Sequence, residues 1–138
     1  MSAMMRAAVI GCGYWGPNLI RNLRLAHGCR LAAVCDLDEK RLAHMKTLYP
    51  EVATTKDFTS IVNDPAIDAI VVATPVHPHH AMASAALQAG KHVMIEKPMA
   101  RSSRECEELC RLAKRRKRVL MIGHTFLYSA PVRKMREI

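Results

Sequence analysis

Short apolar runs alternate along the chain with amphipathic stretches of helical length, and the alternation begins within the first ten residues. The runs that have the length of strands are residues 6–10, 30–35, 52–54, 68–73, 91–95 and 118–122. The stretches with apolar residues at helical spacing are residues 15–26, 38–48, 57–63, 79–89 and a last one that starts at 102 or 103. This order is typical of parallel strands joined by crossover helices. We therefore predict an α/β fold, a doubly wound parallel sheet of about six strands with helices on both faces.

Residues at the ends of the helical stretches agree with this assignment. Pro17 falls in the first turn of the first helix, where proline is tolerated, and Gly90 follows the fourth helix, where glycine commonly ends helices. Ser102 or Ser103 can cap the last helix, with Glu105 in its first turn. The helix limits are therefore predicted by chemistry as well as by periodicity.

Residues 1–123 form one predicted domain, because no repeat, low-complexity tract or linker interrupts the alternation. After Gly123 the pattern changes, and a new amphipathic segment starts at residues 132–138. A helix of so few residues lacks both length for propagation and a face to bury against. We predict that residues 124–138 start the connection to a C-terminal substrate domain that is absent here. The alternative is a frayed terminal segment.

A GxGxxG motif lies between the first predicted strand and the first predicted helix. In a dinucleotide-binding turn the first glycine makes a tight turn, the second lets the backbone approach a pyrophosphate, and the third lets helix pack on strand. The helix N-terminus then faces the anion. We assign this segment to a dinucleotide site of the Rossmann type, with the residues Gly11, Gly13, Tyr14, Trp15 and Gly16. The alternative is a glycine turn that serves packing alone.

Asp36 ends the second predicted strand, 20 residues after Gly16. A carboxylate at this place accepts hydrogen bonds from the hydroxyls of the adenosine ribose. It favours NAD, because the 2′-phosphate of NADP would meet a negative charge. Lys40 and Arg41 are close enough in sequence to keep NADP use open.

A second candidate segment, Ala73, Thr74 and Pro75, ends the fourth predicted strand. Ligands of open α/β folds bind at the carboxyl edge of the sheet, where this strand ends. We therefore predict that these three residues line the cofactor site.

The histidines that follow, His77, His79 and His80, suggest a metal site at first. Adjacent histidines in an extended loop diverge in direction, however, and no carboxylate or cysteine follows at the spacing of a ligand. We therefore predict no metal, and we interpret His79 as a polar wall residue of the cofactor site.

A third candidate segment, Glu96, Lys97 and Pro98, closes the fifth predicted strand. A lysine beside a positively charged nicotinamide would have its ammonium form disfavoured by like charge and by desolvation. It could then exchange a proton nearer neutral pH, as alcohol oxidation requires. Pro98 is a candidate for a cis peptide bond. The alternative is a solvated lysine in a turn.

The net charge of +9 comes from 21 Lys and Arg against 12 Asp and Glu, and it raises the question of a nucleic-acid partner. Much of the excess lies in residues 114–118 and 133–136. The first block falls in the predicted last turn of a helix, where cations complement the negative end of the helix dipole. Because no aromatic residues are interleaved with these charges, we predict a solvated helix end and no nucleic-acid partner.

The cysteines exclude a disulfide framework, because they are odd in number and form no CxxC pair: Cys12, Cys29, Cys35, Cys106 and Cys110. We interpret Cys106 and Cys110, which share a helix face, as half-buried small residues. No stretch approaches the roughly 20 apolar residues of a membrane span, and the start of the chain lacks the apolar run of a signal peptide. A cytoplasmic protein without a membrane partner is predicted.

Five segments occur in the order and at the spacing of one family: GCGYWGPN, VCDLDEKR, ATPVHPHH, ALQAGKHVMIEKPMA and VLMIGHTF. Over nearly its whole length the chain resembles the N-terminal half of the Gfo/Idh/MocA oxidoreductases. The resemblance implies an NAD(P)-dependent dehydrogenase or reductase that acts on sugars, inositols or nucleotide sugars. It also implies a Rossmann domain followed by an open-faced α/β substrate domain.

By the same resemblance, Lys97 contacts substrate and assists proton transfer, and Pro98 is the proline that is often cis in this motif. His79 matches the histidine of TPxxxH, whereas Thr74, Pro75 and Glu96 match positions that line the cofactor. Residues 123–128 are less charged than in many relatives and are nearer to members found with nucleotide-sugar enzymes.

The family's second catalytic histidine and most of its sugar contacts come from the C-terminal domain. We therefore expect this chain to bind the cofactor without being catalytically complete. The alternative is a stand-alone dinucleotide-binding or sensing module without turnover. Apolar positions in residues 124–135 would ordinarily pack on a continuing chain, so we expect either a homo-oligomer or a disordered tail.

Overall fold

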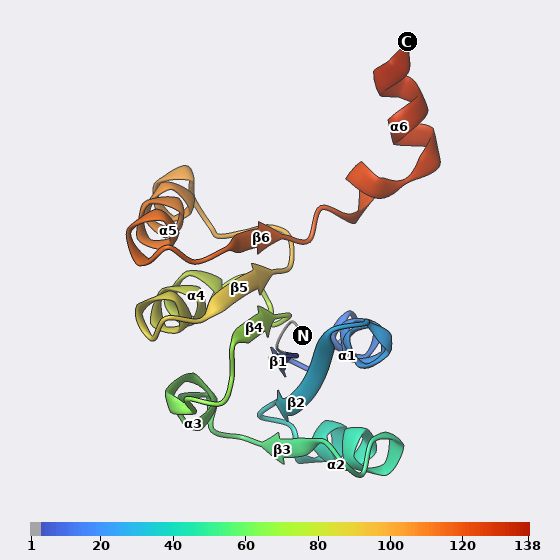
Figure 1. Ribbon diagram of the computed structural model, residues 1–138, viewed down its shortest axis with the longest axis vertical. Helices are drawn as coiled ribbons and strands as arrows, with labels where there is room; N and C mark the ends of the chain where they lie inside the picture. Colours follow the sequence, from blue (N-terminus) through green and yellow to red (C-terminus); the bar gives the residue numbers. More distant parts are fainter. Residues whose placement is uncertain (1–3) are drawn as a thin grey trace.

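A computed structural model describes residues 4–138, in which six parallel strands form one sheet in the order β3-β2-β1-β4-β5-β6 (Figure 1). The strands are β1 (Met5–Ile10), β2 (Cys29–Cys35), β3 (Ala53–Thr55), β4 (Ala69–Val72), β5 (His92–Ile95) and β6 (Leu120–Ile122). The strand order reverses between β1 and β4, which makes the carboxyl ends of these two strands the topological switch point. The predicted doubly wound sheet is confirmed, and each strand limit lies within two residues of its predicted position.

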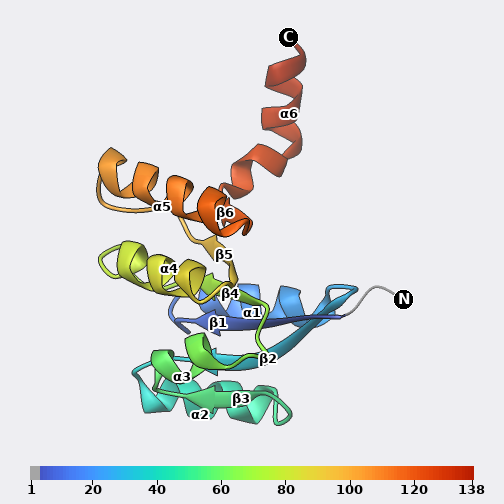
Figure 2. The same cartoon turned by 60° about the vertical axis from the view of Figure 1, so that its left-hand side comes forward.

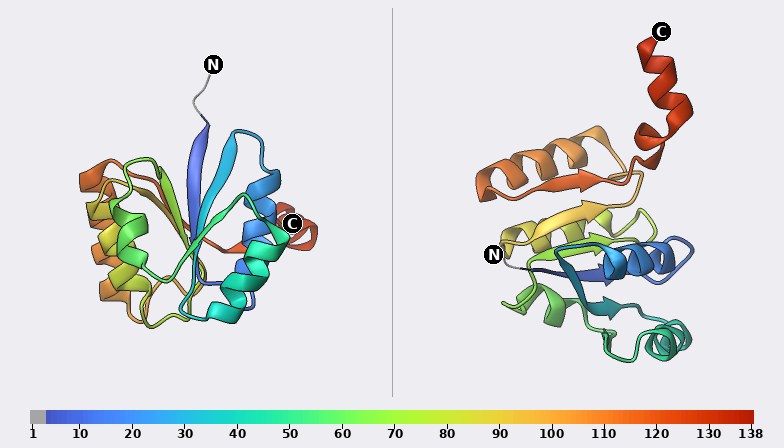
Figure 3. Two further views of the ribbon diagram at one scale, coloured as in Figure 1. Left: turned by 90° about the horizontal axis from the view of Figure 1, so that it is seen from below. Right: turned by 45° about the vertical axis from the view of Figure 1, so that its right-hand side comes forward.

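Helices cover both faces of the sheet (Figure 3, left). One face carries α1 (Gly16–Leu25) and α2 (Glu39–Leu48), and the other carries α3 (Phe58–Asn63), α4 (His79–Gln88) and α5 (Ser103–Arg116). In β1, Ala8 and Ile10 belong to the core under α3, α4 and α5, whereas Val9 belongs to the core under α1 and α2. The strand period of two thus divides the apolar residues of β1 between two cores.

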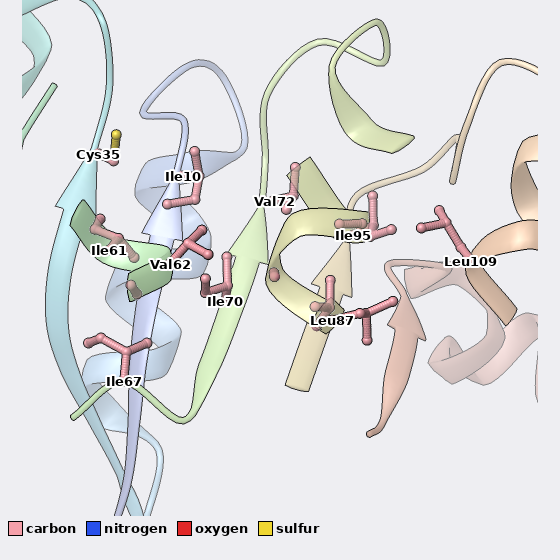
Figure 4. Packing of buried hydrophobic residues seen from close by; sticks show 14 of the residues in the cluster. Ile10, Cys35, Ile61, Val62, Ile67, Ile70, Val72, Leu87, Ile95 and Leu109 are labelled. Carbon is pink, nitrogen blue, oxygen red and sulfur yellow. The ribbon is translucent and has the colours of Figure 1, made fainter. Parts of the chain in front are cut away.

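The larger core lies between the sheet and the helices α3, α4 and α5 (Figure 4). Leu87 of α4 and Leu109 of α5 are completely buried in it, beside Ile70 and Ile95 of the strands. Burial of a side chain of this size contributes roughly 1.5–3 kcal/mol. Because this core spans β4 and β5, it holds rigid the two strands whose ends carry the candidate segments.

Polar caps set where several helices begin. The carboxylates of Asp38 and Asp57 accept backbone N–H groups at the starts of α2 and α3. The hydroxyl of Ser102 accepts the N–H of Glu105, so the predicted cap of α5 is confirmed at this residue. At the other end of α5, Lys114, Arg115 and Arg116 of the predicted basic block occupy the last turn, and Lys117 ends the helix with φ +53°.

Beyond β6 the chain forms a short 3₁₀ helix, η1 (Thr125–Tyr128), and a helix, α6 (Ala130–Glu137), which point away from the sheet (Figures 1 and 2). Neither contains a buried residue. The structure thus assigns helical segments to the tail, of which the 3₁₀ helix was not predicted. The domain limit at residue 123 and the link to a further domain stay predictions.

Between residues 4 and 138, no helix has the length and apolar character needed to cross a membrane.

Candidate functional site

A cavity of about 770 Å³ lies at the carboxyl ends of β1, β2, β4 and β5. Its volume is in the range of small-molecule and cofactor sites, and it lies at the switch point of the sheet. Ten of the residues assigned from sequence line it: Gly11, Gly13, Tyr14, Trp15, Asp36, Ala73, Thr74, Pro75, Glu96 and Lys97. The three others, Gly16, His79 and Pro98, do not line it. Sequence reasoning missed the apolar lining residues Leu37, Phe58, Pro78 and Met82.

Two glycines of the motif are required by the fold itself. Gly11 has φ +100°, and a Cβ on it would lie 2.7 Å from the carbonyl oxygen of Ala73, so the ends of β1 and β4 come together here. A Cβ on Gly16 would overlap the carbonyl oxygen of Gly11. These contacts agree with a tight turn at Gly11 and close packing at Gly16.

Gly13 differs from both, because a Cβ on it would meet only the Arg41 guanidinium, at 3.8 Å. Its backbone lines the cavity, and its missing side chain leaves space open there. At the adjacent start of α1, Trp15 makes no side-chain hydrogen bond to the first turn. The free N–H groups of a helix start attract an anion. The glycine loop therefore fits the pyrophosphate of a dinucleotide.

Asp36 connects the loops that follow β1 and β2. Its Oδ2 accepts the N–H of Cys12 at 2.6 Å, and its Oδ1 accepts the N–H of Asp38 at 2.8 Å. A carboxylate has about four acceptor positions, so it can also accept ribose hydroxyls from the cavity. Arg41 lines the same part of the cavity, with Nη1 3.8 Å from Asp36 Oδ2. A carboxylate and a guanidinium thus lie together where the adenosine ribose is expected.

Glu96 and Lys97 line the cavity from the end of β5. Glu96 is buried, at 7% exposure, and its Oε2 accepts the backbone N–H of Lys97 at 3.3 Å. Lys97 is exposed, and within residues 4–138 its amino group makes neither a hydrogen bond nor an ion pair. The peptide bond between Lys97 and Pro98 is cis, as predicted. The amine is therefore free to meet a ligand in the cavity.

His79 lies behind the wall of the cavity and is 1% exposed. Its Nδ1 lies 2.9 Å from the carbonyl oxygen of Pro98, and its Nε2 lies 2.8 Å from that of Thr74. The side chain joins the loop after β4 to the loop after β5. The sequence predicted His79 in the wall itself. The prediction was wrong because the two partners of the ring lie on other loops, and only the fold brings them to it.

The other two histidines contact α5 and the loop before it. His80 Nε2 lies 3.1 Å from a carboxylate oxygen of Glu108, and His77 Nδ1 lies 3.3 Å from Arg101 Nη1. In the part of the chain from residue 4 to 138, no three His, Cys, Asp or Glu side chains gather as metal ligands would. Each histidine of the segment thus has contacts of its own.

Two cysteines lie close to the cavity. Burial, and then the carboxylate of Asp36, raise the pKa of Cys12 to about 12. Burial, and then Asp36, raise the pKa of Cys35 to about 11. A thiol with such a pKa is almost entirely protonated at neutral pH, so neither cysteine is an effective nucleophile. Among the other cysteines, Cys106 is half-buried as predicted, but Cys110 is exposed, in a surface hollow that Leu120 and Ile122 of β6 also line.

Comparison with known proteins agrees with this geometry. Residues 5–124 match the model of an oxidoreductase family with an NAD-binding Rossmann fold, the Gfo/Idh/MocA family. A dehydrogenase of Comamonas testosteroni, 1-carboxy-3-chloro-3,4-dihydroxycyclohexa-1,5-diene dehydrogenase, is 30% identical over 134 residues, which are 97% of this chain and 34% of the relative.

Two solved structures have the same fold. The biliverdin reductase of Synechocystis sp. PCC 6803, solved with biliverdin and NADP+, superposes with a TM-score of 0.91 at 28% identity over 98% of this chain and 42% of that one. The myo-inositol 2-dehydrogenase of Lactobacillus plantarum superposes with a TM-score of 0.89 at 29% identity, over 97% of this chain and 40% of that one.

The chain spans about a third of the length of the curated relatives it matches. The matched region contains the glycine loop, Asp36, the segment at residues 73–75 and the segment at residues 96–98. The chain therefore belongs to the Gfo/Idh/MocA oxidoreductases, as an NAD(P)-binding Rossmann domain of that family.

Proposed function

We propose that this chain is the cofactor-binding half of an oxidoreductase that moves a hydride to or from a carbinol carbon of a sugar, an inositol or a nucleotide sugar. The proposal rests on one observation: the free amine of Lys97 and the open backbone at Gly13 line the same cavity. NAD(P), when bound, accepts or supplies the hydride. Its pyrophosphate fits Gly13 and its ribose fits Asp36, so the nicotinamide is expected toward Lys97.

Lys97 supplies the proton chemistry in this proposal. Oxidation of a carbinol to a carbonyl removes a hydride from carbon and a proton from the hydroxyl. The neutral amine of Lys97 accepts that proton and becomes an ammonium, and in the reverse direction the ammonium returns it. Glu96 holds the backbone N–H of Lys97, which helps to fix where the side chain leaves the loop.

The substrate class is supported by relatives, one of which is a myo-inositol 2-dehydrogenase. We propose further that the isolated chain binds the cofactor without turnover, since it spans about a third of the matched relatives. An assay of the chain with NAD+ and inositols or sugars should then produce no NADH. Steady production of NADH would contradict this part of the proposal.

Cofactor binding is tested directly by calorimetry with NAD+ and NADH. Gly13→Val fills the space at the glycine loop and Asp36→Ala removes the ribose contact, so each should weaken binding by about tenfold or more, which is about 1.4 kcal/mol. Asp64→Ala, which changes a carboxylate that does not line the cavity, is the matched control. Absence of binding by the folded, unmutated chain would refute the proposal.

A further inference from the structure

His79 is one of three buried polar or charged residues among those described, together with Lys91 and Glu96. Both nitrogens of its ring lie within hydrogen-bond distance of backbone carbonyl oxygens, those of Pro98 at 2.9 Å and Thr74 at 2.8 Å. A carbonyl oxygen only accepts hydrogen bonds. Both partners of the ring are therefore acceptors.

This pair of partners constrains the protonation of the ring. A neutral imidazole has one N–H and one lone pair, so it can donate to only one of the two carbonyls. Its lone pair would then face the oxygen of the other carbonyl, in a place that water does not reach. An imidazolium donates at both nitrogens, and hydrogen bonds from a charged donor are stronger than neutral ones.

The two carbonyls belong to loops that line the cavity from neighbouring strands. Thr74 follows β4 and lines the cavity, and Pro98 adjoins Lys97, which lines it from the end of β5. We propose that His79 is a positioning residue, a doubly protonated ring that holds the Lys97–Pro98 loop at a fixed distance from Thr74. The role assigned to Lys97 rests on the function proposed above, whereas the protonation of the ring does not.

Several ionisable groups lie on the elements around this ring. His80 is on the same helix and His77 on the loop before it, Glu96 and Lys97 are on the loop after β5, and Glu105 and Glu108 are on α5. In residues 4–138 none of them makes a hydrogen bond to the His79 ring, which leaves the two carbonyls as its partners.

The protonation state is tested by long-range proton–nitrogen NMR spectra of the chain labelled with ¹⁵N-histidine, assigned through bonds. Both ring nitrogens of His79 should show the shifts of protonated nitrogens at pH 7. One protonated and one unprotonated nitrogen would overturn the doubly protonated ring. This measurement requires neither a cofactor nor a variant.

The positioning role is tested with His79→Gln, and His80→Gln on the same helix is the control. We compare the affinities for NADH and for ADP-ribose, which lacks the nicotinamide. His79→Gln should weaken NADH by about tenfold and leave ADP-ribose within about twofold, and His80→Gln should change neither. Equal losses of affinity for both ligands would overturn the positioning role. If His79→Gln does not fold, a neutral His79 ring in the NMR spectra of the unmutated chain would overturn it instead. If the unmutated chain binds neither ligand, the proposed function fails, and the ring spectra still decide the protonation.

Discussion

Gly123 leaves the space that the carboxylate of Glu96 occupies. A Cβ on Gly123 would lie 2.8 Å from Glu96 Oε1 and 3.2 Å from Oε2. Gly123 follows β6 and is buried, and Glu96 follows β5 and lines the cavity. Because the carboxylate is the end of a flexible side chain, it would move before the backbone does. A side chain at residue 123 should therefore displace Glu96 toward the cofactor.

Gly123→Ala should weaken the binding of NADH by about fivefold or more, while it leaves the folded state nearly as stable as before. In a Glu96→Ala background the space is already empty, so the same substitution should have little further effect. Titrations of the four variants by NADH fluorescence form a double-mutant cycle that isolates the coupling of the two residues. An equal loss in both backgrounds would show that Gly123 acts through something other than Glu96.

Local chemistry was sufficient to predict the fold and most of the site. The alternation of Ala8, Val9 and Ile10 between two cores is a period of two, and Gly16 packs closely on Gly11, five residues before it in the chain. These signals are short in range and strong. Strand limits, and the loops that line the cavity, were therefore predictable from the sequence alone.

Interactions between distant residues were not predictable in the same way. The ring of His79 is positioned by Pro98, which lies 19 residues along the chain, so its place behind the cavity wall had no local signal. The space that Gly123 leaves for Glu96 joins the ends of two strands. Periodicity describes which face a residue is on, but it does not describe which side chain of another element fills the space opposite.

The side chain of Arg41 should contribute more to the affinity for NADP than to the affinity for NAD. Its guanidinium lines the cavity beside Asp36, where a 2′-phosphate would lie, and a guanidinium pairs well with a phosphate. Arg41→Ala should weaken the binding of NADP by about tenfold and change the affinity for NAD by less than about twofold. Calorimetry with both cofactors checks this. Lys40→Ala, a neighbouring cation that does not line the cavity, is the control and should change neither affinity.

The thiols should react in an order set by burial and pKa. Cys110 is exposed, whereas burial raises the pKa of Cys35 to about 11 and that of Cys12 to about 12. Only the thiolate reacts, and below its pKa the thiolate fraction rises about tenfold for each pH unit. Alkylation with iodoacetamide, followed by mass spectrometry between pH 7 and 9, should modify Cys110 first. Labelling of Cys35 at pH 7 as fast as that of Cys110 would contradict the assignment.

Lys91 should be needed for stability and not for binding the cofactor. It is 7% exposed, and its ammonium donates to the carbonyl oxygens of Asp64 at 2.6 Å and Ile67 at 2.7 Å, away from the cavity. Lys91→Met keeps much of the apolar stem but leaves both carbonyls without their donor, and each buried unsatisfied polar group costs about 1–3 kcal/mol. Urea unfolding should therefore show a loss of about 2 kcal/mol or more, with the affinity for NADH unchanged in the folded protein. Lys114→Met, on the exposed end of α5, is the matched control and should stay within about 0.5 kcal/mol of the unmutated chain. If the two variants unfold alike, the two hydrogen bonds of Lys91 contribute no net stability, and its burial reflects the packing of its stem alone.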